Sequence, residues 1–271
     1  MLAPSRVFAV DWSGDRTAAR RKIWLCEVEG ERVLKLENGR TRDEVARYLV
    51  NESKLDPSFV VGLDFAFSFP AQFLRKRAHH EVGSVWEEAR RFGESWLEHC
   101  PFPFWGKPGK KKPRLGEALY RHTELEVARE TSFQPLSVMQ IGGAGAVGVG
   151  SIRGMPLLAE LRAAGFSIWP FDPPRFPLVV EIWPRLFMGE VVKGRGAARK
   201  VYLAEHHPAL GGGARHAAEE SDDAFDAVIS ALAMDSARLE FGTLLQAEDP
   251  NTLLEGEIWC PAGDAPPAWA S

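Results

Sequence analysis

Cysteine is scarce in this sequence, with three residues among 271. Cys26, Cys100 and Cys260 lie far apart and form neither a Cys-x-x-Cys pair nor a zinc-binding pattern. An odd, scattered set is atypical of the disulfide frameworks that stabilise small secreted proteins. The composition therefore argues against a disulfide-built fold and favours a reducing, cytoplasmic setting.

Long apolar runs are also missing, because no segment approaches the ~20 apolar residues of a membrane-spanning helix. Charged and turn residues interrupt the N-terminus within a few positions, which argues against a secretory signal peptide. No segment is repeated along the chain. We therefore expect neither a membrane protein nor a repeat architecture, while the oligomeric state stays open.

Neither sign of charge dominates, since 33 Lys and Arg oppose 37 Asp and Glu for a net charge of −4. This balance argues against a protein that coats nucleic acid non-specifically, but it permits a local basic groove. With 45% hydrophobic residues, the chain is long enough for one large core. We expect a single domain over residues 1–271.

The first part of the chain predicts a mixed sheet. Three β-branched, apolar segments follow one another with short connections and indicate an antiparallel meander, at residues 6–12, 22–30 and 32–39. Residues 41–53 have helical periodicity behind a Thr cap, and residues 58–67 form a buried strand. A fourth strand parallel to the first would need a right-handed crossover.

The second part begins with an irregular segment, at about residues 70–135, that mixes amphipathic helix with Pro-rich and basic stretches. We interpret it as an insertion over one edge of the core. Further helices and strands then alternate: helices at 151–165, 196–207 and 221–234, strands at 166–171 and 176–184, and a short strand-like stretch at 256–260. The pattern predicts an α/β fold with helices on the faces of the sheet.

The helix at 221–234 is apolar, yet it begins with three aspartates. Ser221 is a good N-cap, and the helix macrodipole favours the negative charge of Asp222 and Asp223 in the first turn. Neither effect explains Asp226, which lies on the same face one turn later. Neighbouring carboxylates on a buried helix repel each other, so a cation beside them is a reasonable explanation.

Other acids occupy similar positions in apolar strands. Asp11 ends the first strand, Asp64 lies near the end of the fourth, and Glu181 interrupts the strand at 176–184. An unpaired charge is costly in such surroundings, and carboxylates are the ligands that Mg²⁺ and Mn²⁺ prefer. Two such ions support phosphodiester hydrolysis. We therefore expect Asp11, Asp64, Asp223 and Asp226 to bind metal, with Glu181 as a base or an extra ligand.

The chain resembles the domain of unknown function 429 family of predicted ribonuclease H-like nucleases. The matching stretches are AVDWSG, GLDFAFSFP, VEIWPRLF and DDAFDAVISAL, at residues 9–14, 62–70, 180–187 and 222–232. The core of the last stretch is also similar to the final helix of RuvC-type Holliday-junction resolvases. The resemblance implies a ribonuclease H-like, five-stranded mixed sheet, with Asp11 and Asp64 on the central strands and Asp223 and Asp226 on the last helix.

A glycine-rich segment at residues 142–150 supports a rival interpretation. Its GAGAVG motif matches the dinucleotide-binding pattern, which would suit a nucleotide-dependent phosphotransferase or dehydrogenase. The residues before it make a poor strand, however, and Asp172 lies farther along than the usual ~20 residues. A hinge between the insertion and the core is the simpler interpretation.

A basic loop in the insertion favours nucleic acid, DNA or RNA, as the partner. It contains Lys107, Lys110, Lys111, Lys112 and Arg114 without an acid among them, near Phe102, Phe104 and Trp105. Cations bind phosphates and aromatic rings stack on bases, although a solvated loop explains the charges equally well. Arg199 either contacts phosphate or faces water. A non-catalytic nucleic-acid-binding protein with this fold remains the alternative outside enzymes.

Overall fold

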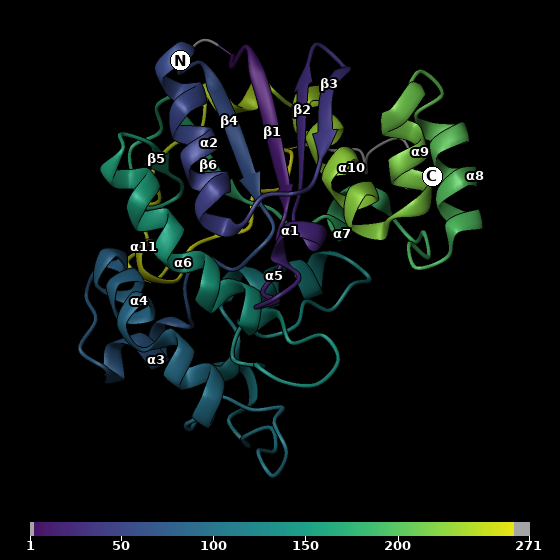
Figure 1. Ribbon diagram of the computed structural model, residues 1–271. Helices are drawn as coiled ribbons and strands as arrows, with labels where there is room; N and C mark the ends of the chain where they lie inside the picture. The colour runs from purple at the N-terminus through teal and green to yellow at the C-terminus, as the bar shows by residue number, and fades with distance from the viewer. Residues whose placement is uncertain (1–2, 263–271) are drawn as a thin grey trace.

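The first three strands form an antiparallel meander at one side of a mixed sheet (Figure 1). A computed structural model describes residues 3–262. In it, β1 (Arg6–Asp11) pairs antiparallel with β2 (Trp24–Glu29), which pairs antiparallel with β3 (Arg32–Glu37). The predicted meander is confirmed. Gly30 and Glu31 both have positive φ in the β2–β3 turn, as a tight hairpin with the natural strand twist requires.

A helical crossover places the next strand parallel to β1. Helix α2 (Arg42–Leu55) starts with a capping box, in which Thr41 accepts from the Glu44 amide and Glu44 accepts from the Thr41 amide. Strand β4 (Phe59–Leu63) then pairs parallel with β1, with Val10 opposite Leu63. The two strands are thus parallel neighbours, the arrangement that the sequence analysis considered for them, and their carboxyl ends meet at the same edge of the sheet.

Two later strands complete the sheet in the order β3-β2-β1-β4-β6-β5. Strand β6 (Leu178–Glu181) is parallel to β4, and β5 (Ser167–Ile168) is parallel to β6. The described residues thus form six strands rather than the expected five. Strand β5 is short because Pro170, which has no N–H to donate, follows it closely. The stretch at 256–260 contributes only one bridge, between Ile258 and Glu181.

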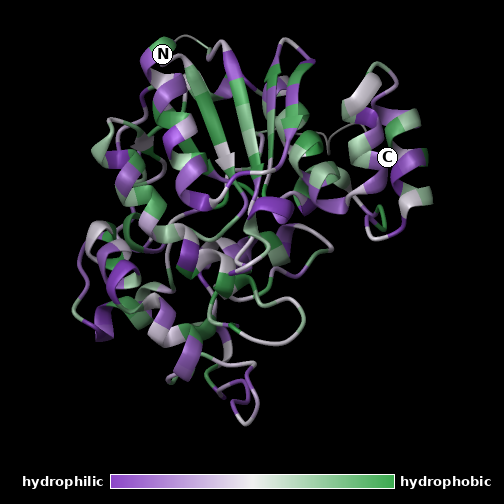
Figure 2. Cartoon of the chain, in the orientation of Figure 1, coloured by the Kyte–Doolittle hydropathy of each residue, from purple (hydrophilic) through white to green (hydrophobic). Residues whose placement is uncertain are grey.

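Alternating residues of β1 face two separate hydrophobic clusters. Phe8 and Val10 pack on the side of α2 and α6 (Val147–Ala163), whereas Val7 and Ala9 pack on the side of α10 (Asp222–Ser236). Helices therefore cover both faces, and the central strands are largely hydrophobic in Figure 2. By the same alternation, Asp11 lies on the face that α10 covers.

The remaining elements surround this sandwich. The insertion contains α3 (Ala71–Lys76), α4 (Val82–His99), the 3-10 helix η1 (Gly116–Leu119) and α5 (His122–Glu130), and α4 packs against α6. Helices α7 (Arg185–Met188) and α9 (Gly212–Glu220) contact α10, and α8 (Gly196–His206) packs against α9; of these three, the sequence pattern predicted only α8. Short helices at α1 (Ala19–Lys22), η2 (Glu240–Gly242) and α11 (Thr252–Glu255) complete the set within residues 3–262.

The insertion shares the core of the sheet, because its Trp86 and Phe104 belong to the same hydrophobic cluster as Phe8. In Figure 1 its helices lie below the sheet, on the side where the parallel strands end. Across the described part of the chain, no helix has both the length and the apolar character that crossing a membrane requires.

Close packing of β4 against α10 predicts a specific cost at Gly62. A Cβ there would lie 2.5 Å from Met234 Sδ and 2.9 Å from the branched side chain of Ile182, all within the core. Gly62→Ala should lower the free energy of unfolding by about 1–3 kcal/mol through overpacking. Urea denaturation measures this change.

The matched control is Gly213→Ala, at a helical position where a Cβ meets nothing within 4 Å. It should leave stability unchanged or raise it by up to ~1 kcal/mol. Equal effects of the two substitutions would contradict the packing argument.

Candidate functional site

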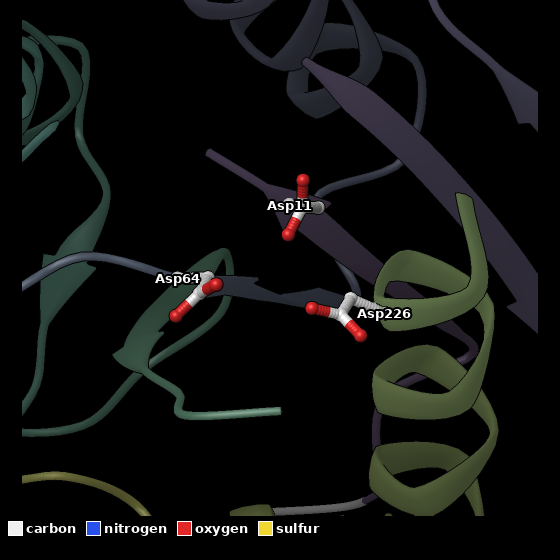
Figure 3. Close-up of side chains that lie close together, drawn as sticks. All are labelled: Asp11, Asp64 and Asp226. Carbon is white, nitrogen blue, oxygen red and sulfur yellow. The ribbon is translucent and has the colours of Figure 1, made fainter. Parts of the chain in front are cut away.

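Three aspartates meet where the parallel strands end (Figure 3). Asp11 is the last residue of β1, Asp64 directly follows β4, and Asp226 lies one turn into α10. The Asp64 amide donates to the Val10 carbonyl at 3.1 Å, which continues the β1–β4 ladder and fixes the two acids side by side. One carboxylate oxygen from each residue lies within 4.8 Å of the other two.

The fold shields these carboxylates from water. Asp11 is 8% exposed and Asp226 1% exposed, while Asp64 is partly buried. Asp226 Oδ2 accepts from the ammonium of Lys193, but its Oδ1 is buried without a hydrogen-bond partner among the described residues. A buried acceptor with no donor is costly, so this oxygen is an open ligand position in an otherwise packed region.

Burial and mutual repulsion shift the acids toward their protonated forms. Burial, followed by the charges of Asp226 and Asp64, raises the pKa of Asp11 well above its ordinary value. Burial and then Asp226 raise the pKa of Asp64 to about 8. Burial raises the pKa of Asp226 to about 6, against the opposing effect of Lys193. A divalent cation would relieve both causes, since it supplies charge and replaces lost hydration.

Asp223, expected as a fourth ligand, lies outside this group of three. It lies on the same face of α10 as Asp226 but one turn nearer the N-terminus of the helix, where it is less buried. Its side chain is partly buried, and its pKa is raised by burial and then by the exposed Asp222. Asp223 still contributes to the raised pKa of Asp11. It therefore borders the cluster rather than completing it.

Glu181 lies on strand β6, as expected, but its carboxylate pairs with Arg121 and not with the aspartates. Its two oxygens accept from Arg121 at 2.7 and 2.5 Å, and Oε2 also accepts from the Phe67 amide at 2.9 Å. Arg121 is 1% exposed and also contacts Glu124. Because these bonds occupy Glu181, the structure places it as an anchor between β6 and the insertion, rather than as a free base or ligand.

The basic loop differs in part from the sequence interpretation. Lys110, Lys111, Lys112 and Arg114 are exposed and Lys107 is partly exposed, but Lys112 donates to Tyr120 Oη at 2.9 Å. Phe104 and Trp105 lie in the core, so of the three nearby aromatic residues only Phe102, at 76% exposure, is free to stack on a base. The loop retains charge for phosphate contact but little aromatic surface.

Arg199 faces the interior, contrary to both uses that the sequence suggested. It is 5% exposed, and its guanidinium donates to the carbonyls of Ala218, Glu219 and Lys193. In this conformation it has no access to a substrate phosphate. It fastens the loop that carries Lys193 to helix α9.

The glycine-rich segment serves close packing. A Cβ at Gly14 would lie 2.5 Å from the Gly150 amide nitrogen, and one at Gly106 would lie 2.2 Å from the Gly142 carbonyl oxygen. In the described chain the segment follows irregular structure instead of a sheet strand, which a dinucleotide-binding unit requires. Gly142 thus packs against Gly106 of the insertion, and Gly150 packs against Gly14 in the β1–α1 loop.

A cleft of about 380 Å³ opens beside the acids. Asp64, Asp226 and Lys193 line it together with Trp12 and Trp183. A larger groove of about 1420 Å³ lies between β3, α8, α9 and α10, and none of the three clustered acids lines it. We assign the candidate site to the smaller cleft because Asp64 and Asp226 of the acid trio line it.

Lys193 was missed by sequence reasoning. It lies in an irregular loop after α7, and nothing in its local pattern distinguishes it from a solvated surface lysine. Only the fold brings it to Asp226. The comparisons with known proteins add no assignment, because no family model, no curated protein and no solved structure matches this chain.

The raised pKa of Asp64 predicts how metal-free stability depends on pH. Between its unfolded value near ~4 and about 8, the folded protein keeps a proton that the unfolded chain has released. Folding stability should therefore fall as pH rises through this window. Asp64→Asn removes the titration, so its melting temperature in chelator should rise relative to that of the parent from about pH 5 to about pH 8.

The exposed neighbour Asp222 provides the control for this measurement. Asp222→Asn removes the same charge from outside the cluster, so the difference between its melting temperature and that of the parent should not vary with pH across the range. A constant difference between Asp64→Asn and the parent at all pH values would contradict the assigned shift.

Proposed function

We propose that this protein has a ribonuclease H-like fold and is a divalent-metal-dependent nuclease. The observation that carries the proposal is the buried trio of Asp11, Asp64 and Asp226, in which one oxygen of Asp226 has no partner. The antiparallel meander with parallel strands beside β1, and the acids on β1, after β4 and on α10, support the resemblance noted in the sequence.

The acids present suit Mg²⁺ or Mn²⁺. Asp11, Asp64 and Asp226 offer hard oxygen ligands from three elements, and Asp223 borders them on the solvent side. Burial disfavours the ionised state of these carboxylates unless a cation is bound. The trio therefore contributes little to stability by itself but is well suited to bind a metal ion. Phosphodiester hydrolysis at such sites uses the Lewis acidity of bound cations.

Other residues of the cleft suit a phosphate-containing substrate. Lys193 places an ammonium beside the acids, and Trp183, which is partly exposed, adds aromatic surface to the wall of the cleft. A strand of nucleic acid offers the cleft a phosphate for the ammonium and a base that can stack on Trp183. The exposed lysines of the basic loop would extend the contact to further phosphates.

Asp226→Asn tests the catalytic role of the trio. Asn retains the size of Asp but removes the charge that attracts the cation, so cleavage of labelled single-stranded, duplex and branched DNA and RNA should be abolished. Asp222→Asn, an exposed change on the same helix, should retain activity. Cleavage by Asp226→Asn at the parental rate in Mg²⁺ or Mn²⁺ would refute the proposal.

Thermal melts separate a metal ligand from a structural acid at the same position. Mn²⁺ at about ten times its dissociation constant should stabilise the parent by about 1.4 kcal/mol, and Asp226→Asn by much less. Metal binding without cleavage of any of these substrates would instead indicate a non-catalytic binding protein.

The basic loop makes a separate prediction about salt. Replacing Lys110, Lys111 and Lys112 by Ala should weaken nucleic-acid binding and reduce the slope of log K against log salt by about 0.7–0.9 for each lost phosphate contact. Lys112 should contribute least, because Tyr120 already engages it. Fluorescence anisotropy at several salt concentrations measures the slope, and an unchanged slope would show that the loop does not contact the substrate.

A further inference from the structure

Lys193 is the one basic side chain that forms an ion pair with the acid trio within residues 3–262. Its ammonium contacts Asp226 Oδ2. The side chain of Lys193 is 39% exposed, whereas the side chain of Asp226 is only 2% exposed. Lys193 therefore reaches from the wall of the cleft to Asp226, whose other oxygen has no hydrogen-bond partner among the described residues. It stands where a bound cation would compete with it.

The loop that carries Lys193 is held from both ends. Arg185 donates to the carbonyls of Gly189 at 2.9 Å and Val191 at 3.0 Å. Arg199, which is buried, donates to the carbonyl of Lys193 itself and joins it to the end of α9. The guanidinium groups of Arg185 and Arg199 thus hold the backbone of an otherwise irregular loop, so the fold determines the position of Lys193 beside the acids.

We propose that Lys193 is a tethered counter-ion of the acid trio, which occupies Asp226 in the metal-free protein and is displaced when a divalent cation binds. This inference rests on the proposed metal-dependent function. The displaced ammonium stays in the cleft, because Arg199 retains its backbone, and it is then free to bind a phosphate of the substrate. Loading the cation thereby exposes a second positive group for the same substrate.

Electrostatics explain why Lys193 can pair with Asp226 in the metal-free protein and leave it when a divalent cation binds. In the absence of metal, an ammonium in contact with Asp226 offsets part of the repulsion among the three carboxylates. With metal bound, the ammonium and the ion would carry like charges a few Å apart, which is unfavourable even in a well-solvated site. The lysine therefore stabilises the empty site and opposes loading of the cation.

Three variants test the proposal through Mg²⁺ binding, measured by isothermal titration calorimetry at alkaline pH, where proton competition is weakest. Lys193→Met removes the charge and keeps most of the stem, so Mg²⁺ should bind about fivefold or more tightly. Lys193→Arg keeps the charge and should bind Mg²⁺ like the parent. Lys200→Met removes an exposed positive charge that pairs with Glu220 on the surface, and it too should match the parent.

Thermal melts provide a readout that needs no cleavage. In chelator, Lys193→Met should melt below the parent, because Asp226 loses its partner. Saturating Mg²⁺ should remove this difference. A lysine with a purely structural role would leave the variant destabilised under both conditions, and this result would overturn the proposal.

The outcomes also separate this inference from the proposed function. If the parent binds Mg²⁺ and Lys193→Met binds it equally or more weakly, the counter-ion role is wrong while the metal site stands. If the parent binds neither Mg²⁺ nor Mn²⁺, both proposals are wrong.

Discussion

The structure depends on holding three carboxylates together against their mutual repulsion. Parallel pairing of β1 and β4 places Asp11 and Asp64 at neighbouring strand ends, and the close approach of α10, which Gly62 permits, adds Asp226. None of these contacts would survive in isolation, because each brings like charges into a region of low polarity. The hydrophobic clusters on both faces of the sheet provide the opposing free energy.

Glu181 and the aspartate trio are both buried at this edge of the sheet, but they differ in whether their charges and hydrogen bonds are satisfied. Glu181 is matched by Arg121 and by a backbone amide, so its charge and its hydrogen-bonding capacity are satisfied. Asp226 has one lysine contact and one free oxygen, and neither Asp11 nor Asp64 has an ion-pair partner in the described chain. A satisfied buried pair anchors the insertion, whereas unsatisfied acids indicate a ligand.

Local pattern predicts those parts of this protein that local physics determines. Short β-branched, apolar segments located β1, β2, β3 and β4, and the Thr41 and Ser221 caps marked the starts of two helices. Strand ends then placed Asp11 and Asp64 together. The partner of Glu181 and the burial of Arg199 depend on residues far away in the chain, and a one-sequence pattern contains no signal for such pairings. The edge strand β5 was misjudged in extent for a local reason, the proline that follows it.

The position of Lys193 links these observations. A site prepared for a divalent cation is least stable when it is empty, since its ligands are then unscreened charges in a poorly hydrated place. A protein with such a site gains from a group that partly neutralises it without filling it. Lys193 meets that need. The hydrogen bond from Arg199 holds its backbone, its flexible side chain reaches Asp226, and the partial exposure of that side chain allows the ammonium to move away. Under the proposed metal-dependent function, the hydrogen bonds of Arg199 would keep the displaced ammonium near the cleft, where its charge would attract an anionic substrate.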